Sequence, residues 1–375
     1  MNIYLDNAST TFPKAPGLGK AVGDFIENNG ININRSVTES SAAEELVFET
    51  RKLICRLFRG GNPERVIFTS GATISINMLL RGLLKCGDHV VTSSMEHHAL
   101  MRPLKQLEGE GVRYTAVKAD KEGMIRVSDI EEAIRPNTRL IFVTHASNVC
   151  GTVLPVKEIS ELAEKYGIYF ALDSAQTAGI LDIEAEKTDF LVFSGHKGLM
   201  GPQGTGGFVI SKKLAKELRP YIRGGTGSYS HSYEMPPELP DRFEAGTLNL
   251  PGIAGLNHSL KYILNIGIEK IRQREAERTK QLTEGLKSLP VKIIGRSGAE
   301  SRVGVVSIIA PYSDNGILAQ RLSEKGIVLR YGLHCAPSAH ETLGTIKTGT
   351  IRLSVGYFTT EEEIEYTLSA IDELV

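Results

Sequence analysis

Short apolar runs of strand length alternate with stretches of helical period from residue 65 to about residue 210. Alternation of this kind predicts an α/β fold in which a mainly parallel sheet carries helices on both faces. Ligands on such sheets bind beyond the carboxyl ends of the strands, so we expect the polar motifs that follow the runs to share one cleft. The runs are 65–69, 89–92, 140–144, 169–172, 190–193 and 207–210.

The remainder of the chain has a different pattern. Residues 224–251 are rich in Gly, Pro, Ser and Tyr without a clear period, and we expect this long loop to cover a site or to cross to a partner subunit. A helical stretch from about 251 to 289 is expected to link two domains. Strand-like runs near 303–309, 327–330 and 350–354 then predict a smaller α+β domain.

This pattern divides the chain into two domains. We predict a large α/β domain at residues 15–258 and a small C-terminal α+β domain at 259–375, joined by the N-terminal segment 1–14.

Composition excludes several classes of function. The 375 residues include 43 basic and 44 acidic side chains, so the net charge of −1 offers no footprint for nucleic acid. The sequence contains no run of about 18 apolar residues, which a membrane span would need. The start lacks the basic and apolar regions of a signal peptide. We therefore expect a cytoplasmic protein. Four scattered cysteines without a C-x-x-C pair suggest neither a metal site nor a disulfide framework.

One lysine dominates the candidate chemistry. Lys197 follows the apolar run 190–193, and Asp173 closes an earlier run in the same way. A lysine that can hold pyridoxal phosphate as a Schiff base (aldimine), opposite an aspartate that keeps the pyridine nitrogen protonated, is the pair that such an enzyme needs. Burial and nearby positive charge are expected to lower the pKa of Lys197.

Two further motifs fit the same cofactor. Ala72 and Thr73 stand between a strand and a helical run, where free backbone N–H groups and the Thr73 hydroxyl would face a phosphate. His97, at the end of another strand, would stack on the ring and move protons. Each feature alone is more often a helix cap or a structural residue, but the combination with Lys197 favours the cofactor.

Several motifs, in order along nearly the whole chain, resemble those of cysteine desulfurases of the class V aminotransferase fold. They are Met95-Glu96-His97-His98, Ser147-Asn148, Asp173-Ser174-Ala175-Gln176, Ser194-Gly195-His196-Lys197, 242–247 and 330–336. The resemblance implies a fold type I, pyridoxal phosphate-dependent homodimer with a seven-stranded sheet. It also implies conversion of L-cysteine to L-alanine, sulfur left as a cysteine persulfide, a sulfur-acceptor protein, and a place in iron–sulfur cluster assembly.

The resemblance also implies roles for single residues. Asn148 and Gln176 would lie near the phenolic oxygen of the cofactor, while Ser194 and His196 would hold the phosphate with Thr73. Thr247 would reach the phosphate of the partner subunit. Arg352 would clamp the substrate carboxylate, and Arg330 would line the mouth of the site.

Cys335 separates this family from ordinary aminotransferases. Its position in 330–336 implies a nucleophile, and His334 and Arg330 are expected to favour the thiolate that attacks the substrate sulfur. The short distance in sequence from Cys335 to Arg352 resembles the Suf-type group, in which the cysteine lies on a restrained loop.

The chain departs from the family pattern at three places. Ala72-Thr73-Ile74 replaces Thr-Thr-Glu in the phosphate motif, Asn34 stands where a histidine is common near the substrate, and Leu333 replaces the first histidine before Cys335. These changes leave the cofactor chemistry intact and bear on the substrate, the acceptor protein and the rate. The alternatives to a cysteine desulfurase are a selenocysteine lyase, another aminotransferase or β-lyase of this fold, and a non-catalytic sulfur-carrier module.

Overall fold

A computed structural model describes residues 2–29, 33, 42–296, 298, 301–311 and 314–375, so Asn34 lies outside the described residues. The main sheet has seven strands in the order β2-β8-β7-β6-β5-β3-β4. Only β8 runs antiparallel to its neighbours, which confirms the prediction of a mainly parallel α/β sheet. Their bounds are β2 Val66–Thr69, β3 His89–Ser93, β4 Arg113–Val117, β5 Thr138–Thr144, β6 Tyr169–Asp173, β7 Phe190–Ser194 and β8 Gly206–Ile210.

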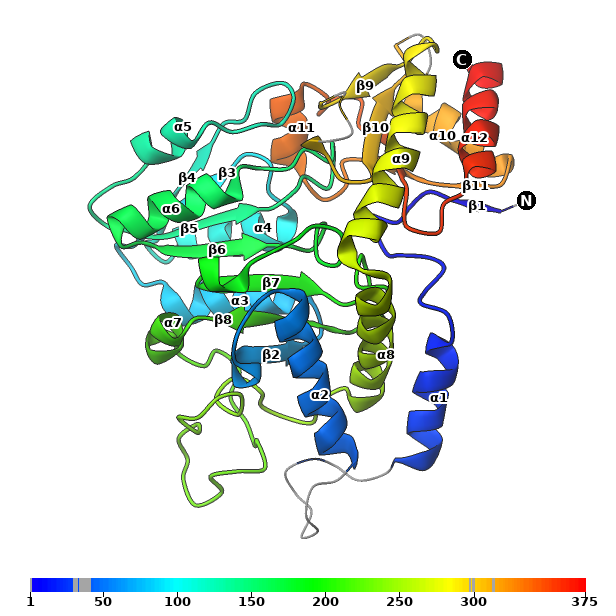
Figure 1. Ribbon diagram of the computed structural model, residues 1–375. Helices are drawn as coiled ribbons and strands as arrows, with labels where there is room; N and C mark the ends of the chain where they lie inside the picture. Colours follow the sequence, from blue (N-terminus) through cyan, green and yellow to red (C-terminus); the bar gives the residue numbers. More distant parts are fainter. Residues whose placement is uncertain (1, 30–32, 34–41, 297, 299–300, 312–313) are drawn as a thin grey trace.

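Helices cover both faces of this sheet (Figure 1). In β5, Leu140 and Phe142 pack into the apolar cluster that includes α3 and α4, while Ile141 and Val143 pack into the cluster on the opposite face. All four side chains are fully buried, which is why the central strands are continuous apolar runs. The helices around the sheet are α2 Ala42–Leu57, α3 Ala72–Leu83, α4 His98–Glu108, α5 Val127–Glu132, α6 Val156–Tyr166 and α7 Lys212–Glu217.

The C-terminal part is built on a second, antiparallel sheet of order β12-β13-β10-β9. Apolar side chains of α9, α10 and α12 form a separate core with this sheet. The limits predicted for the two domains stay a prediction. The bounds are β9 Lys292–Ile294, β10 Val305–Ile309, β12 Arg330–Gly332, β13 Thr350–Ser354, α9 Ile268–Lys287, α10 Asn315–Glu324, α11 Pro337–Leu343 and α12 Glu361–Leu374.

The helical stretch predicted between 251 and 289 is two helices rather than one. Gly267 has a positive φ of 90° and separates α8 (Leu250–Ile266) from α9. A left-handed backbone there stops the first helix and lets the second begin at a new angle.

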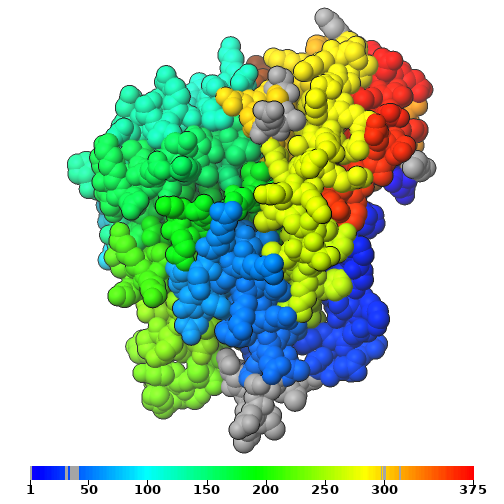
Figure 2. Space-filling model, in the orientation of Figure 1, coloured from blue at the N-terminus to red at the C-terminus, as the bar shows by residue number. Residues whose placement is uncertain are grey.

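The N-terminal segment runs between the two sheets. Its strand β1 (Ile3–Tyr4) pairs in parallel with β11 (Ile327–Val328) of the C-terminal part. The chain then passes the main sheet, and α1 (Leu18–Asn28) packs along α8. Figure 2 shows this blue segment beside the yellow helices and below the red C-terminal helix. None of the helices in the described ranges is long and apolar enough to cross a membrane.

Glu275 is a buried carboxyl group on α9. Its side chain is 4% exposed, its Oε2 has no hydrogen-bond partner among the described residues, and burial raises its pKa to about 8. An unfolded glutamate titrates at about pH 4.3, so between these values the folded protein binds the extra proton. Stability should therefore fall as pH rises from about 5 to 8.

A Glu275→Gln variant tests the direction of this change in stability with pH. The neutral amide cannot ionise, so the stability of the variant relative to the wild type should grow by about 3.5 kcal/mol between pH 5 and pH 8. Chemical denaturation at both pH values measures this difference. A difference that stays constant with pH would contradict a protonated Glu275 in the folded state.

Candidate active site

A cavity of about 290 Å³ lies where strands β2, β5, β6 and β7 end and α3 and α4 begin. The structure brings together there nine of the ten residues predicted to bind the cofactor. They are Ala72, Thr73, His97, Asn148, Asp173, Gln176, Ser194, His196 and Lys197. The strand ends therefore meet in one cleft, as the sequence predicts.

Lys197 reaches into this cavity, where protein encloses its amine. Enclosure lowers the pKa of Lys197 to about 8, the nearby Asp173 carboxylate opposes this effect, and Arg352 and Arg330 reinforce it. An amine with this pKa is partly uncharged near neutral pH and can act as a nucleophile.

The N-terminal segment fixes the backbone around the lysine. The carbonyl of His196 accepts hydrogen bonds from Lys14 Nζ at 2.7 Å and from Thr10 Oγ1 at 3.0 Å. The carbonyl of Lys197 accepts one from Thr11 Oγ1 at 2.7 Å. Side chains nearly 190 residues away in sequence thus hold the loop that carries Lys197.

Asp173 is buried at the end of β6. Its Oδ1 accepts a hydrogen bond from the Ala175 backbone N–H at 2.9 Å. Burial raises the pKa of Asp173, while that hydrogen bond and the charge of Lys197 lower it. A carboxylate so placed would gain a charge-assisted hydrogen bond from a protonated ring nitrogen.

The start of α3 is arranged for an anion. Gly71, with φ of 147°, precedes the helix, and no side chain in the described part of the chain caps its first N–H groups. Ser194 and His196 line the same cavity, and His196 Nδ1 is buried without a partner among the described residues. A phosphate there would accept hydrogen bonds from these donors and would lie at the positive end of the helix.

His97 both caps α4 and faces the cavity. Its Nδ1 accepts a hydrogen bond from the Ala99 N–H at 3.0 Å. Burial, then the charge of Lys197, lowers the pKa of His97 to about 4. The neutral ring therefore carries its proton on Nε2, the nitrogen that is free to donate.

These residues fit pyridoxal phosphate. The cavity offers an amine, a buried carboxylate, a neutral imidazole and an uncapped helix start, and each meets one part of that cofactor. Ala72 and Ile74 supply no hydroxyl or carboxylate, so backbone N–H groups and the Thr73 hydroxyl remain as the donors from this motif.

Cys335 lies beside the cavity on a fixed loop. Its Sγ is 3.5 Å from Arg330 Nη2, and its carbonyl accepts a hydrogen bond from the His98 N–H at 2.7 Å. His334 and Cys335 both have positive φ, 48° and 59°. Neither is a glycine, so the loop holds a backbone conformation that costs energy, as is common at functional sites.

The expectation for His334 is wrong. Its ring is 2% exposed, and its Nε2 hydrogen-bonds with the Thr350 hydroxyl at 2.9 Å. Burial lowers the pKa of His334 to about 2, so the ring is uncharged at neutral pH and supplies no cation to Cys335. Arg330 is the charged side chain in contact with the thiol.

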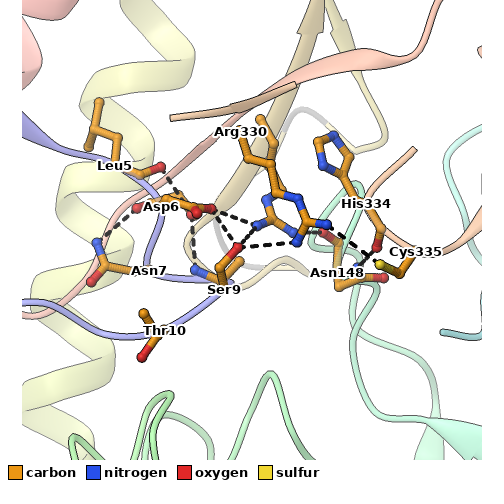
Figure 3. Close-up of polar contacts among 12 residues, drawn as sticks. Leu5, Asp6, Asn7, Ser9, Thr10, Asn148, Arg330, His334 and Cys335 are labelled. Carbon is orange, nitrogen blue, oxygen red and sulfur yellow. Dashed lines mark hydrogen bonds and ion pairs between the residues drawn. The ribbon is translucent and has the colours of Figure 1, made fainter. Parts of the chain in front are cut away.

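Arg352 is buried between the two sheets. Its Nη2 donates to Asp6 Oδ1 and to Ser9 Oγ, each at 2.7 Å, and its Nη1 donates to the Asn148 carbonyl at 3.1 Å. Figure 3 shows Asp6, Ser9, Arg330 and Cys335 along one line of polar contacts. The sequence reasoning missed Asp6 and Ser9, although a polar run, 6–11, directly follows the apolar residues 3–5.

Thr247 is the predicted cofactor residue that lies outside the first cavity. It lines a neighbouring cavity of about 300 Å³, which shares Ser70 and Ile74 with the first. Leu333, one of the departures from the family pattern, is 37% exposed beside Cys335.

Comparison with known proteins agrees with the arrangement of this site. The family model for class-V aminotransferases matches residues 3–367. A probable cysteine desulfurase of Pyrococcus abyssi is 33% identical over 383 residues, which cover 100% of this chain and 94% of the relative. Another, of Methanothermobacter thermautotrophicus, is 34% identical over 382 residues with the same coverage.

A solved structure is similar over the whole chain. The apo structure of a cysteine desulfurase from Thermococcus onnurineus NA1 has a TM-score of 0.93 and 33% identity, and the match covers 100% of this chain and 94% of the other. Fold, cavity and sequence similarity therefore agree: the chain belongs to the class-V aminotransferase family, whose members depend on pyridoxal phosphate.

Proposed function

We propose that this chain is a cysteine desulfurase, which converts L-cysteine to L-alanine and transfers the sulfur to Cys335. The observation that carries the proposal is the position of the thiol. Cys335 lies 3.5 Å from Arg330 on a constrained loop, beside the cavity that holds Lys197. An aminotransferase needs the lysine but has no use for a thiol at this place.

Arg352 is suited to bind the substrate carboxylate. It is 1% exposed, its Nε has no partner among the described residues, and Asp6 and Ser9 fix its guanidinium. Pyridoxal phosphate, when bound, supplies the electron sink that stabilises negative charge on the substrate carbon. The Lys197 amine would remove and return the proton at that carbon. Asp173 would hold the ring nitrogen of the bound cofactor, and His97 would donate a hydrogen bond from Nε2.

Cys335 takes the sulfur. Its thiolate attacks the substrate sulfur, so that an S–S bond forms while the bond between that sulfur and its carbon breaks. The electron pair of the broken bond stays with the carbon fragment, which gains a proton and leaves as alanine. Arg330 keeps the thiol in place and favours the thiolate by its charge.

Purified protein loaded with the cofactor tests the proposal. We expect equal amounts of alanine and sulfide from L-cysteine when a thiol reductant regenerates Cys335. A keto acid without sulfide would instead indicate an aminotransferase. Turnover confined to selenocysteine would indicate a selenocysteine lyase, and an unchanged cofactor spectrum with every amino acid would indicate a non-catalytic module.

The cavity that contains Thr247 supports a homodimer. It opens beside the first cavity, and the irregular segment between α7 and α8 carries the exposed Tyr229 and Tyr233. A second copy that covers this face would bring Thr247 of one subunit toward the phosphate site of the other. Sedimentation should therefore give a dimer, and a strictly monomeric holoenzyme would contradict this assembly.

Sulfur on Cys335 would pass to an acceptor protein with a reactive thiol. Cys335 is partly exposed, so a partner can reach it. All four cysteines are unpaired, which fits a reducing compartment such as the cytoplasm.

A further inference from the structure

The N-terminal segment brings the Asp6 carboxylate to Arg352 and the Ser9 hydroxyl to both arginines of the site. Ser9 Oγ donates to Asp6 Oδ1 at 2.9 Å and accepts from Arg330 Nη1 at 3.4 Å. Both oxygens also accept from Arg352 Nη2. Because Arg330 Nη2 donates to Cys335, a continuous polar chain joins Asp6 to the thiol, as Figure 3 shows.

The charges around the thiol come from several elements. Arg330 on β12 and Arg352 on β13 are positive, and Asp6 is the carboxylate that pairs with Arg352. The Lys197 amine is close enough to interact electrostatically with all three. Burial lowers the pKa of every histidine near this group, so these rings add little charge at neutral pH. The histidines are His97, His98, His334 and His340.

We propose that Asp6 and Ser9 are positioning residues that hold both arginines and set how readily the Cys335 thiol ionises. Asp6 offsets one of the two positive charges, so the thiolate gains less stabilisation than two bare arginines would give. Ser9 keeps the Arg330 guanidinium against the sulfur. The inference rests on the proposed role of Cys335 as the nucleophile.

A thiolate that the neighbouring positive charges stabilise only in part is well suited to sulfur transfer. Thiolates lose intrinsic nucleophilicity as the pKa of their thiol falls, and the best attacking thiol has a pKa near the ambient pH. A strongly stabilised thiolate is also more prone to oxidation. Asp6 therefore keeps the Cys335 thiol reactive without turning it into an easily oxidised thiolate.

The test measures the rate of alkylation of Cys335 by iodoacetamide as a function of pH. A Cys86→Ala background removes the exposed cysteine, and peptide mass spectrometry assigns the label. Asp6→Asn should lower the pH of half-maximal rate by about half a unit to one unit, because one negative charge is lost. Ser9→Ala should raise it, since Arg330 loses its contact while every charge remains.

Asp24→Asn is the matched control. Asp24 lies exposed on α1, where it pairs with Lys20, and the substitution makes the same change in net charge. The pH of half-maximal alkylation rate should be the same for this variant as for the Cys86→Ala background. If Asp6 and Ser9 had only a structural role, Asp6→Asn and Ser9→Ala would shift the pH of half-maximal rate in the same direction or leave it unchanged. Either result would overturn the proposal.

Two features keep the test decisive. If Asp6→Asn does not fold, as judged by circular dichroism, the Ser9→Ala shift decides alone, and an unchanged midpoint refutes the proposal. The assay contains no substrate, so it does not depend on turnover. Failure of the wild type to form alanine would count against the proposed function and not against this coupling.

Discussion

Replacement of Cys335 by alanine should reduce alanine and sulfide formation from L-cysteine on the order of 10²-fold or more, because no other thiol is placed to take the sulfur. Cys335 contacts Arg330 on a loop tied by backbone bonds, whereas Cys55 and Cys150 are buried away from the cavity lining. Burial raises the pKa of Cys55 to about 11, which leaves it protonated. Cofactor binding should stay unchanged, because Cys335 does not line the cofactor cavity.

Cys86→Ala is the control for the loss of one thiol. Cys86 is exposed after α3, outside both cavities, so this variant should keep wild-type turnover. Alanine and sulfide are measured for both variants with L-cysteine, and selenide release with selenocysteine. Full activity of Cys335→Ala on cysteine would refute the persulfide mechanism, while activity kept only on selenocysteine would show that selenium leaves without the thiol.

Replacement of Lys197 by alanine should lower turnover on the order of 10³-fold or more, since the amine both holds the cofactor and moves the substrate proton. Lys197 is the lysine that lines the cofactor cavity among the described residues, and enclosure lowers its pKa to about 8. The visible absorbance band of lysine-linked cofactor should disappear, while the phosphate contacts at α3 should retain some unlinked cofactor.

Lys212→Ala is the matched control on the surface. Lys212 is exposed at the start of α7, so its loss should change neither absorbance nor turnover. Absorbance spectra and steady-state rates of both variants, recorded at equal cofactor content, measure the effect. A Lys197→Ala protein that retained the wild-type band would place the linkage on another amine.

The central strands were predictable because each is buried on both faces. β5 and β7 are continuous apolar runs, and such runs are typical of parallel sheets. β4 escaped prediction because it is an edge strand of mixed character, Arg113–Val117, with several partly exposed side chains. The break at Gly267 was missed because a single glycine is tolerated within many helical patterns.

The site was predictable only where residues follow strand ends. Lys197, Asp173 and His97 share one cavity because the carboxyl ends of the strands meet there. Asp6 and Ser9 could not be assigned, since their contacts with Arg352 span more than 340 residues. His334 was misjudged because its charge depends on burial, which the sequence does not show.

The most direct test of the central claim is the mass of the peptide that contains Cys335 after one turnover. Protein loaded with the cofactor is mixed with one equivalent of L-cysteine without reductant, quenched, alkylated and digested. We predict one added sulfur atom on Cys335, in an amount equal to the alanine released, and none on Cys86. Alanine formed with an unmodified Cys335 would contradict the proposed transfer of sulfur to this residue.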